Sequence, residues 1–154
     1  MIKINVISNN KVWHQHLKNP ERYIEDKIIK INRKCKKYKK KKIYCTLLLS
    51  GASEIKKLNK KFRRINKSTD ILSFPSYEKN DFKKKLKTEK EIYIGDIIIN
   101  FNKVILKKSK LNFLDEFNKL WIHGLTHLFG YDHKKNKDFK VMMQFEKKLL
   151  SFIK

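Results

Sequence analysis

Three histidines lie close together near the end of the chain, at His123, His127 and His133. In a helix, His123 and His127 share one face because they are four residues apart, so two ring nitrogens can converge on one ion. Gly130 can adopt the left-handed conformation that ends a helix and turns His133 back toward them. Three imidazoles leave a fourth position open, which is typical of catalytic zinc, although nickel and copper also suit such a site.

The spacing H-x3-H-x2-G-x2-H is that of the metzincin proteases, in which a glutamate follows the first histidine and acts as the general base. This chain has Gly124 at that position, and glycine can neither accept a proton nor orient a water. We therefore expect a metal site of this geometry with a chemistry other than metzincin proteolysis. The alternative is that the histidines are ordinary surface residues of a helix.

The elements that carry the site follow from periodicity and capping. Asn112 is a predicted N-cap, with Asp115 in the first turn. A stripe of large apolar residues at helical spacing predicts the buried face of this helix, while His123 and His127 lie at its edge. The stripe consists of Phe113, Phe117, Leu120, Trp121, Leu125 and Leu128.

The whole chain, residues 1–154, is predicted to form a single α+β domain. We expect a small mixed sheet packed with about five helices, and the metal site at a helix C-terminus. Predicted strands cover residues 2–6, 43–49, 71–74 and 92–99. Predicted helices cover 20–35, 53–65 with Ser53 as its cap, 102–110, the metal helix and 137–152, and residues 76–90 are predicted to form a polar loop.

Several separated segments resemble one protein family. HGLTHLFGYDH, at 123–133, resembles the signature of the YbeY endoribonucleases, which are bacterial metal-dependent enzymes of ribosomal RNA maturation and ribosome quality control. Residues 58–75 are similar to that family's "LN, aromatic-Arg, PTDVLSFP" segment, except that Ser68 replaces the usual proline. Residues 94–97 resemble its "LGDI" strand and 142–146 its M-x3-E element, whereas the first fifty residues match none of its motifs.

Arg63 is the catalytic residue that this resemblance implies. Arginine occurs only four times in the chain, and its planar guanidinium suits bidentate contact with phosphate. Arg64 competes for the role, but successive helical residues point about a hundred degrees apart, so one of the two faces the cleft. The resemblance selects Arg63; the alternative is that it forms a surface ion pair.

The resemblance implies metal-dependent cleavage of single-stranded ribosomal RNA, with small ribosomal subunit proteins as further partners. A zinc ion would polarise a phosphoryl oxygen and lower the pKa of a water, and Arg63 would neutralise charge in the transition state. The nucleophile is left open between that water and the RNA 2′-hydroxyl. Two rival functions are a metallohydrolase of peptides and a non-catalytic ribosome-assembly factor with a structural metal.

Polar residues outside the histidine cluster are expected to support the turns and the metal site. Asp96 lies within an apolar strand, where a carboxylate needs a partner, and we expect it to bond a ligand histidine or a loop. Asp132 either supports the metal site or caps the turn before His133. Thr69 and Asp70 are predicted to form a turn.

A formal net charge of +24 at pH 7 favours a polyanionic partner, but the lysine excess also fits the codon usage of an AT-rich genome. The lysine runs at 34–42 and 83–87 are alternative RNA contacts or solvated surface. Without a long apolar segment or a signal peptide, we expect a cytoplasmic protein without a membrane partner. Cys35 and Cys45 lack metal-ligand spacing and are expected to be reduced thiols.

Overall fold

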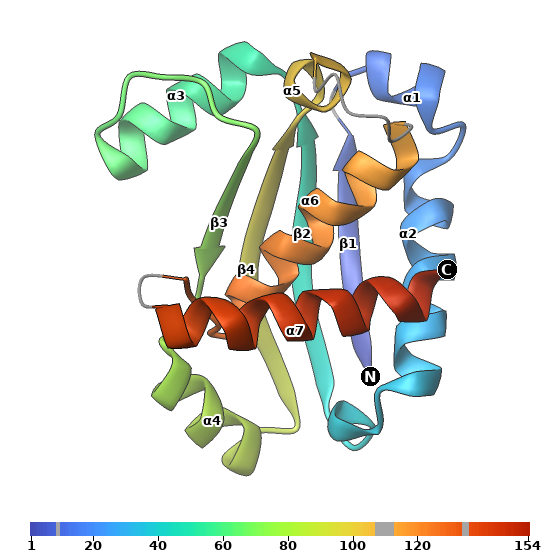
Figure 1. Ribbon diagram of the computed structural model, residues 1–154, viewed down its shortest axis with the longest axis vertical. Coiled ribbons are helices and arrows are strands. Elements are labelled where there is room, and N and C mark those ends of the chain that lie inside the picture. The colour runs from blue at the N-terminus through green and yellow to red at the C-terminus, as the bar shows by residue number, and fades with distance from the viewer. Residues whose placement is uncertain (9, 107–112, 134–135) are drawn as a thin grey trace.

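The computed structural model describes residues 1–8, 10–106, 113–133 and 136–154. Four strands form one sheet in the order β1-β2-β4-β3 (Figure 1). Strands β1, β2 and β4 are parallel, and β3 is antiparallel to β4. Their bounds are Ile2–Ser8 for β1, Lys42–Ser50 for β2, Ile71–Pro75 for β3 and Glu91–Asn100 for β4. The α+β class and the mixed sheet are thus confirmed.

Seven α-helices and one short 3-10 helix, η1, occur in the described residues. They are α1 (Val12–His16), α2 (Pro20–Lys34), η1 (Lys36–Tyr38), α3 (Ala52–Arg63), α4 (Lys79–Thr88), α5 (Phe101–Leu106), α6 (Phe113–Leu128) and α7 (Asn136–Ile153). Within the described part of the chain, no helix combines the length and apolar character that crossing a membrane requires.

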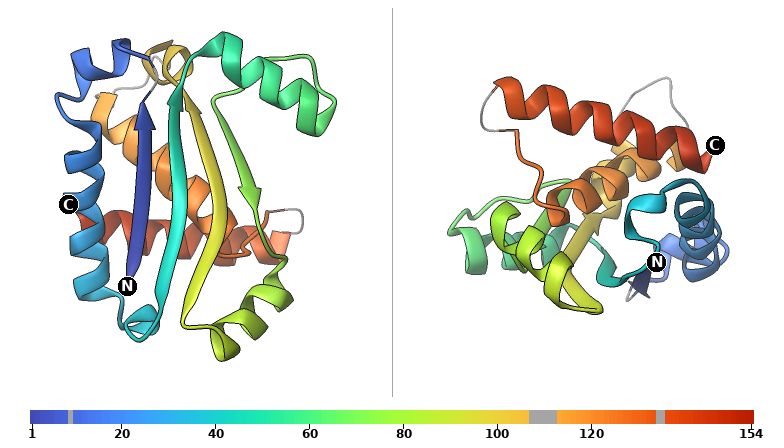
Figure 2. Two further views of the ribbon diagram at one scale, coloured as in Figure 1. Left: turned by 180° about the vertical axis from the view of Figure 1, so that it is seen from behind. Right: turned by 90° about the horizontal axis from the view of Figure 1, so that it is seen from below.

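Helices α6 and α7 cross one face of the sheet, and from behind the strands lie in front of them (Figures 1 and 2). Burial alternates along β1 and β2, as expected when helices cover one face of the sheet. The end of β4 is buried continuously, because Ile97 faces α6 and Ile98 packs with Ile55 of α3 on the other face. Most of the predicted stripe of α6 is buried, with Phe117, Trp121 and Leu125 fully inside the core, and Phe113 is partly buried. Because α6 is held by this burial, it is a rigid base for the side chains at its edge.

The predicted loop at 76–90 is wrong, because most of it forms α4. Phe82 and Leu86 are four residues apart and pack into the main core, where the Phe82 ring lies 5.9 Å from the Phe129 ring. Lysine is also a good helix former, so a lysine-rich segment with two apolar anchors can form a surface helix. The polar composition hid this pattern.

The cap of α3 also differs from the prediction. Its N-cap is Gly51 rather than Ser53, and the helix begins at Ala52. The amide N–H of Ala52 donates to the side chain of Asn102, from the start of α5, at 3.3 Å. A distant residue therefore supplies this capping bond. Asn112, the predicted cap of α6, and the end of the predicted helix 102–110 lie outside the described residues.

Candidate metal centre

The turn after α6 brings the third histidine to the other two. Gly130 has a φ of 79°, and its N–H donates to the carbonyl of His127, while the N–H of Tyr131 donates to the carbonyl of Thr126. These two bonds form a Schellman motif, the standard left-handed end of a helix. The predicted role of Gly130 is therefore confirmed, and the chain after it returns toward the helix.

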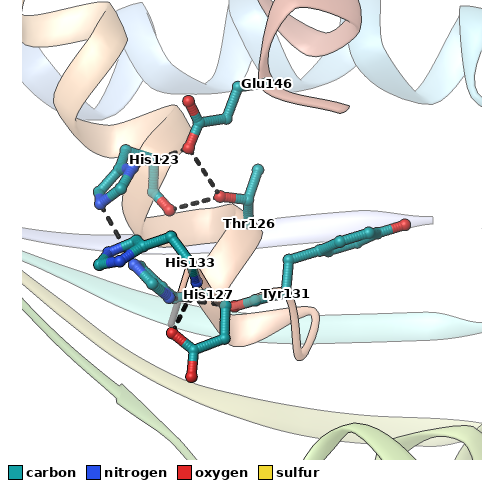
Figure 3. Close-up of polar contacts among 7 residues, drawn as sticks. His123, Thr126, His127, Tyr131, His133 and Glu146 are labelled. Atoms are coloured by element: carbon teal, nitrogen blue, oxygen red, sulfur yellow. Dashed lines mark hydrogen bonds and ion pairs between the residues drawn. The ribbon is translucent and has the colours of Figure 1, made fainter. Parts of the chain in front are cut away.

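The three imidazoles converge on one point, as Figure 3 shows. One nitrogen from each of His123, His127 and His133 lies within 4.8 Å of the other two. The Nε2 atoms of His123 and His127 are 3.2 Å apart. Two nitrogens bound at Zn–N distances of about 2.0–2.1 Å in a tetrahedral site are roughly 3.3 Å apart, so this spacing fits a shared ion.

Hydrogen bonds at the far side of two rings fix their tautomers. The Nδ1 of His123 lies 2.7 Å from Oε1 of Glu146, and the Nδ1 of His127 lies 3.1 Å from the carbonyl oxygen of Tyr131. Since a carboxylate and a carbonyl can only accept, each Nδ1 donates, and each neutral ring presents a lone pair on Nε2. Two lone pairs that face each other at 3.2 Å repel unless a cation lies between them.

Glu146 reaches this site from α7 and contacts Nδ1 of His123, whereas Nε2 of the same ring faces His127 (Figure 3). Its carboxylate also accepts from the hydroxyl of Thr126 at 3.3 Å. Carboxylate partners of this kind orient a ligand histidine and raise its basicity. Glu146 belongs to the M-x3-E resemblance at residues 142–146, which was the available sequence signal, although no role was predicted for it.

Burial lowers the pKa of His127, and the neighbouring His123 and His133 lower it further. Loss of hydration and nearby positive charge both disfavour the imidazolium form. The ring of His127 is therefore kept neutral, which is the form that ligates a metal.

Gly124 faces the sheet and not the histidines. A Cβ at this position would lie 2.7 Å from Cγ2 of Ile97 on β4 and 3.0 Å from Cδ1 of Ile71 on β3. Glycine thus lets α6 pack closely on two strands. A glutamate here, where metzincins carry their base, would be directed into the core and away from the three imidazoles.

A cleft of about 940 Å³, called the histidine cleft, contains all three histidines and Arg63. Arg63 is the last residue of α3, and its guanidinium lies 3.4 Å from the carbonyl of Ser73 on β3. Arg64 is the C-cap, in the left-handed conformation with a φ of 59°, and does not line this cleft. The structure thus brings Arg63, rather than Arg64, into one cavity with the histidines.

Asp96 does not bond a ligand histidine, so that expectation is wrong. Its carboxylate accepts from the hydroxyl of Tyr93 at 2.5 Å. Strand β4 has an irregularity at Gly95, which has a φ of 128° and shifts the register against β2. This extra residue places Tyr93 and Asp96 on the same face of the sheet, since Tyr93 pairs with Tyr44 and Asp96 with Thr46.

Two further aspartates near the site form local hydrogen bonds within turns. Asp132 accepts from the N–H of His133 at 2.8 Å and so fixes the turn. Asp70 accepts from the N–H of Ile71 and from the hydroxyl of Thr69, as expected of a turn.

Cys35 and Cys45 are both free, in agreement with the prediction of thiols.

The two lysine runs lie at the same end of the sheet (Figure 1). The first includes η1 and the second lies on α4. Tyr38 anchors the first run, because its ring stacks on Phe129 with centroids 5.0 Å apart. Both runs are thus connected to the end of α6 through packed aromatic side chains.

Known proteins are similar to this chain over most of its length. The family model described as "Endoribonuclease YbeY" matches residues 7–154. A protein named endoribonuclease YbeY from Pelagibacter ubique is 43% identical over 156 aligned residues, which cover 100% of this chain and 97% of that protein. A protein of the same name from Mycoplasmopsis pulmonis is 36% identical, with 72% of this chain and 73% of that protein covered.

A solution structure from Thermotoga maritima is similar to this fold, with a TM-score of 0.56 and 26% sequence identity. The likeness covers 99% of this chain and 89% of that one. The family model and the Pelagibacter ubique relative both span α6, the turn that carries His133, and the strands β2, β3 and β4. The chain therefore belongs to the YbeY endoribonuclease family.

Proposed function

We propose that this chain is an endoribonuclease that cleaves RNA with a divalent transition metal, preferably zinc, held by His123, His127 and His133. The observation that best supports this proposal is the 3.2 Å distance between the Nε2 atoms of His123 and His127. Each Nδ1 donates to an oxygen on the far side of its ring, so both Nε2 lone pairs point toward the shared position. Neutral imidazoles in this arrangement suit zinc and other late transition metals. The family to which the chain belongs supports cleavage of RNA as the reaction.

When bound, the metal supplies a Lewis acid for the phosphoryl group and a lowered pKa for water. Glu146 holds His123 by its Nδ1, and the carbonyl of Tyr131 holds His127. Arg63, across the histidine cleft, binds the phosphate and neutralises the charge that develops in the transition state. The nucleophile is a water or the 2′-hydroxyl of the RNA.

We further propose that the substrate is single-stranded ribosomal RNA and that small ribosomal subunit proteins are partners in the cytoplasm. The net charge of +24 and the open cleft support a single-stranded polyanion as substrate. The resemblance of residues 123–133 to the YbeY signature supports a ribosomal substrate.

The decisive experiment follows chelation by circular dichroism and by cleavage of a labelled single-stranded RNA in parallel. A catalytic metal predicts that cleavage is lost while the helical signal remains, and that zinc restores cleavage. A metal that only braces the fold, as in an assembly factor, predicts that both are lost together. Cleavage that is unaffected by complete removal of metal would refute the proposal.

His127→Ala provides the matching variant. It should lose one-to-one zinc binding and RNA cleavage while it keeps its secondary structure. His14→Ala is the control, because His14 is exposed on α1 and lies outside the cluster. Zinc binding by His127→Ala at the level of His14→Ala would contradict the assignment of the ligands.

A further inference from the structure

A second cavity, of about 620 Å³, adjoins the histidine cleft and shares Arg63 with it. We call it the lysine cavity, because Lys67 and Lys103 line it together with Arg63. All three cations are exposed, and Asp70 is the one carboxylate among the lining residues. Three cations around one concave surface attract an anion.

Two buried asparagines hold the loop that lines this cavity. Asn59 of α3 is 4% exposed, and its Nδ2 donates to the carbonyl of Lys67 at 2.7 Å. Asn100 is fully buried at the end of β4. Its Nδ2 donates to the hydroxyl of Ser68 at 2.9 Å and to the carbonyl of Thr69 at 3.0 Å.

The backbone completes the hold, because the N–H of Asn100 donates to the carbonyl of Asp70 at 2.9 Å. Burial of an amide side chain is unfavourable unless it is hydrogen-bonded. Here the two side chains bond three successive residues of one surface loop, 67–69, and the backbone of Asn100 bonds the next. The loop conformation is therefore fixed before any ligand arrives. Sites that bind with precision need such support from the residues behind them.

Ser68 adds a donor between the cations. Its oxygen accepts from Asn100, so the hydroxyl proton is left to donate, and none of the described residues accepts it. A hydroxyl beside lysines is a common partner of phosphate oxygens in nucleic acids. The cavity thus offers charge and a directed hydrogen bond to the same ligand.

The lysine cavity and the histidine cleft follow one continuous segment of chain. Residues 67–70 line the first, and Ile71, Ser73 and Pro75 on β3 line the second. Arg63 lies at the boundary between them. A strand of RNA that lies along this segment would therefore pass from one to the other.

We propose that the lysine cavity is a phosphate subsite for the nucleotide next to the one cleaved at the histidine cleft. Lys67, Lys103 and the Ser68 hydroxyl hold that neighbouring phosphate and so set the register of the strand. Contacts to phosphate position the chain and carry no base preference. This inference rests on the proposed function, since it assumes that RNA occupies the histidine cleft.

The test measures binding without cleavage, by fluorescence anisotropy of a labelled short oligoribonucleotide with chelator-treated protein. The variant Lys67→Gln/Lys103→Gln should raise the Kd on the order of tenfold and lower the slope of log K against log salt by about 1.4, for two lost phosphate contacts. The control Lys56→Gln/Lys57→Gln removes the same charge from exposed positions of α3 outside the cavity. It should change the Kd much less. Equal losses in the two variants would overturn the subsite.

A set of oligoribonucleotides, each with one neutral methylphosphonate linkage, locates the contact. One linkage should weaken binding to the native protein and to the control, and the same linkage should have little effect on the cavity variant. If the cavity variant keeps the full sensitivity, the proposal is wrong. If one methylphosphonate position weakens binding but cleavage does not depend on metal, the phosphate subsite stands and the proposed function is refuted. Failure of the subsite can therefore be told apart from failure of the proposed function.

Discussion

Replacement of Gly124 by alanine tests how closely α6 must pack on the sheet. Alanine in place of glycine inside a helix normally stabilises by about 1 kcal/mol. Here the new Cβ would lie 2.7 Å from Cγ2 of Ile97 and 3.0 Å from Cδ1 of Ile71, about 1 Å closer than favourable carbon contacts. Ile97 is fully buried on a strand between two others and has little room to move.

Overpacking of this kind costs roughly 1–3 kcal/mol. Set against the gain in helix propensity, the expected net effect of Gly124→Ala is a loss of about 1 kcal/mol in the free energy of unfolding. Urea denaturation measures it, with the midpoint lowered at constant m. RNA cleavage should fall as well, because a shift of α6 away from β4 moves His123 and His127 relative to Arg63.

A double-mutant cycle with Ile97→Ala isolates the contact. Ile97→Ala removes both Ile97 atoms, Cγ2 and Cδ1, that a Cβ at position 124 would meet. In that background Gly124→Ala should cost less or stabilise, which gives a coupling energy of about 1–2 kcal/mol. If Gly124→Ala stabilises the native protein by the full helix-propensity gain, the argument for close packing at this glycine fails.

Arg63→Ala should slow RNA cleavage by about 10²–10³-fold, whereas Arg64→Ala should not, and similar rates for the two variants would refute the choice between them. Glu146→Gln should weaken zinc binding by about 10–100-fold with the fold intact, as measured by competition with a chelating dye; unchanged affinity would show that this carboxylate does not support the site. Burial raises the pKa of the Cys45 thiol from 9.0 to about 12, so it should resist iodoacetamide in the native protein, and stability should fall as pH rises from 9 toward 12 because the unfolded chain releases this proton first. Glutamine at residues 39–42 should raise KM for RNA and flatten its salt dependence with little change in kcat; unchanged slopes would mean that this run is solvated surface.

The sequence by itself determined the parts of the site that depend on local geometry. His123 and His127 share a helical face because of their spacing, and Gly130 turns the chain because glycine tolerates a positive φ. The four strands were also predictable, since alternating or continuous apolar residues indicate them directly. That residues 1–154 form one domain stays a prediction.

Only the tertiary structure decided which distant residues complete the site. Glu146 reaches His123 from another helix, and Gly124 is needed because two strands lie against it. The irregularity at Gly95 turned Asp96 away from the histidines, although its strand had been predicted correctly. Such contacts join segments far apart in the chain, and residue spacing carries information only about neighbours within a turn or a strand. The lysine cavity is of the same kind, because Asn100 and Lys67 meet only after β4 and α3 have packed.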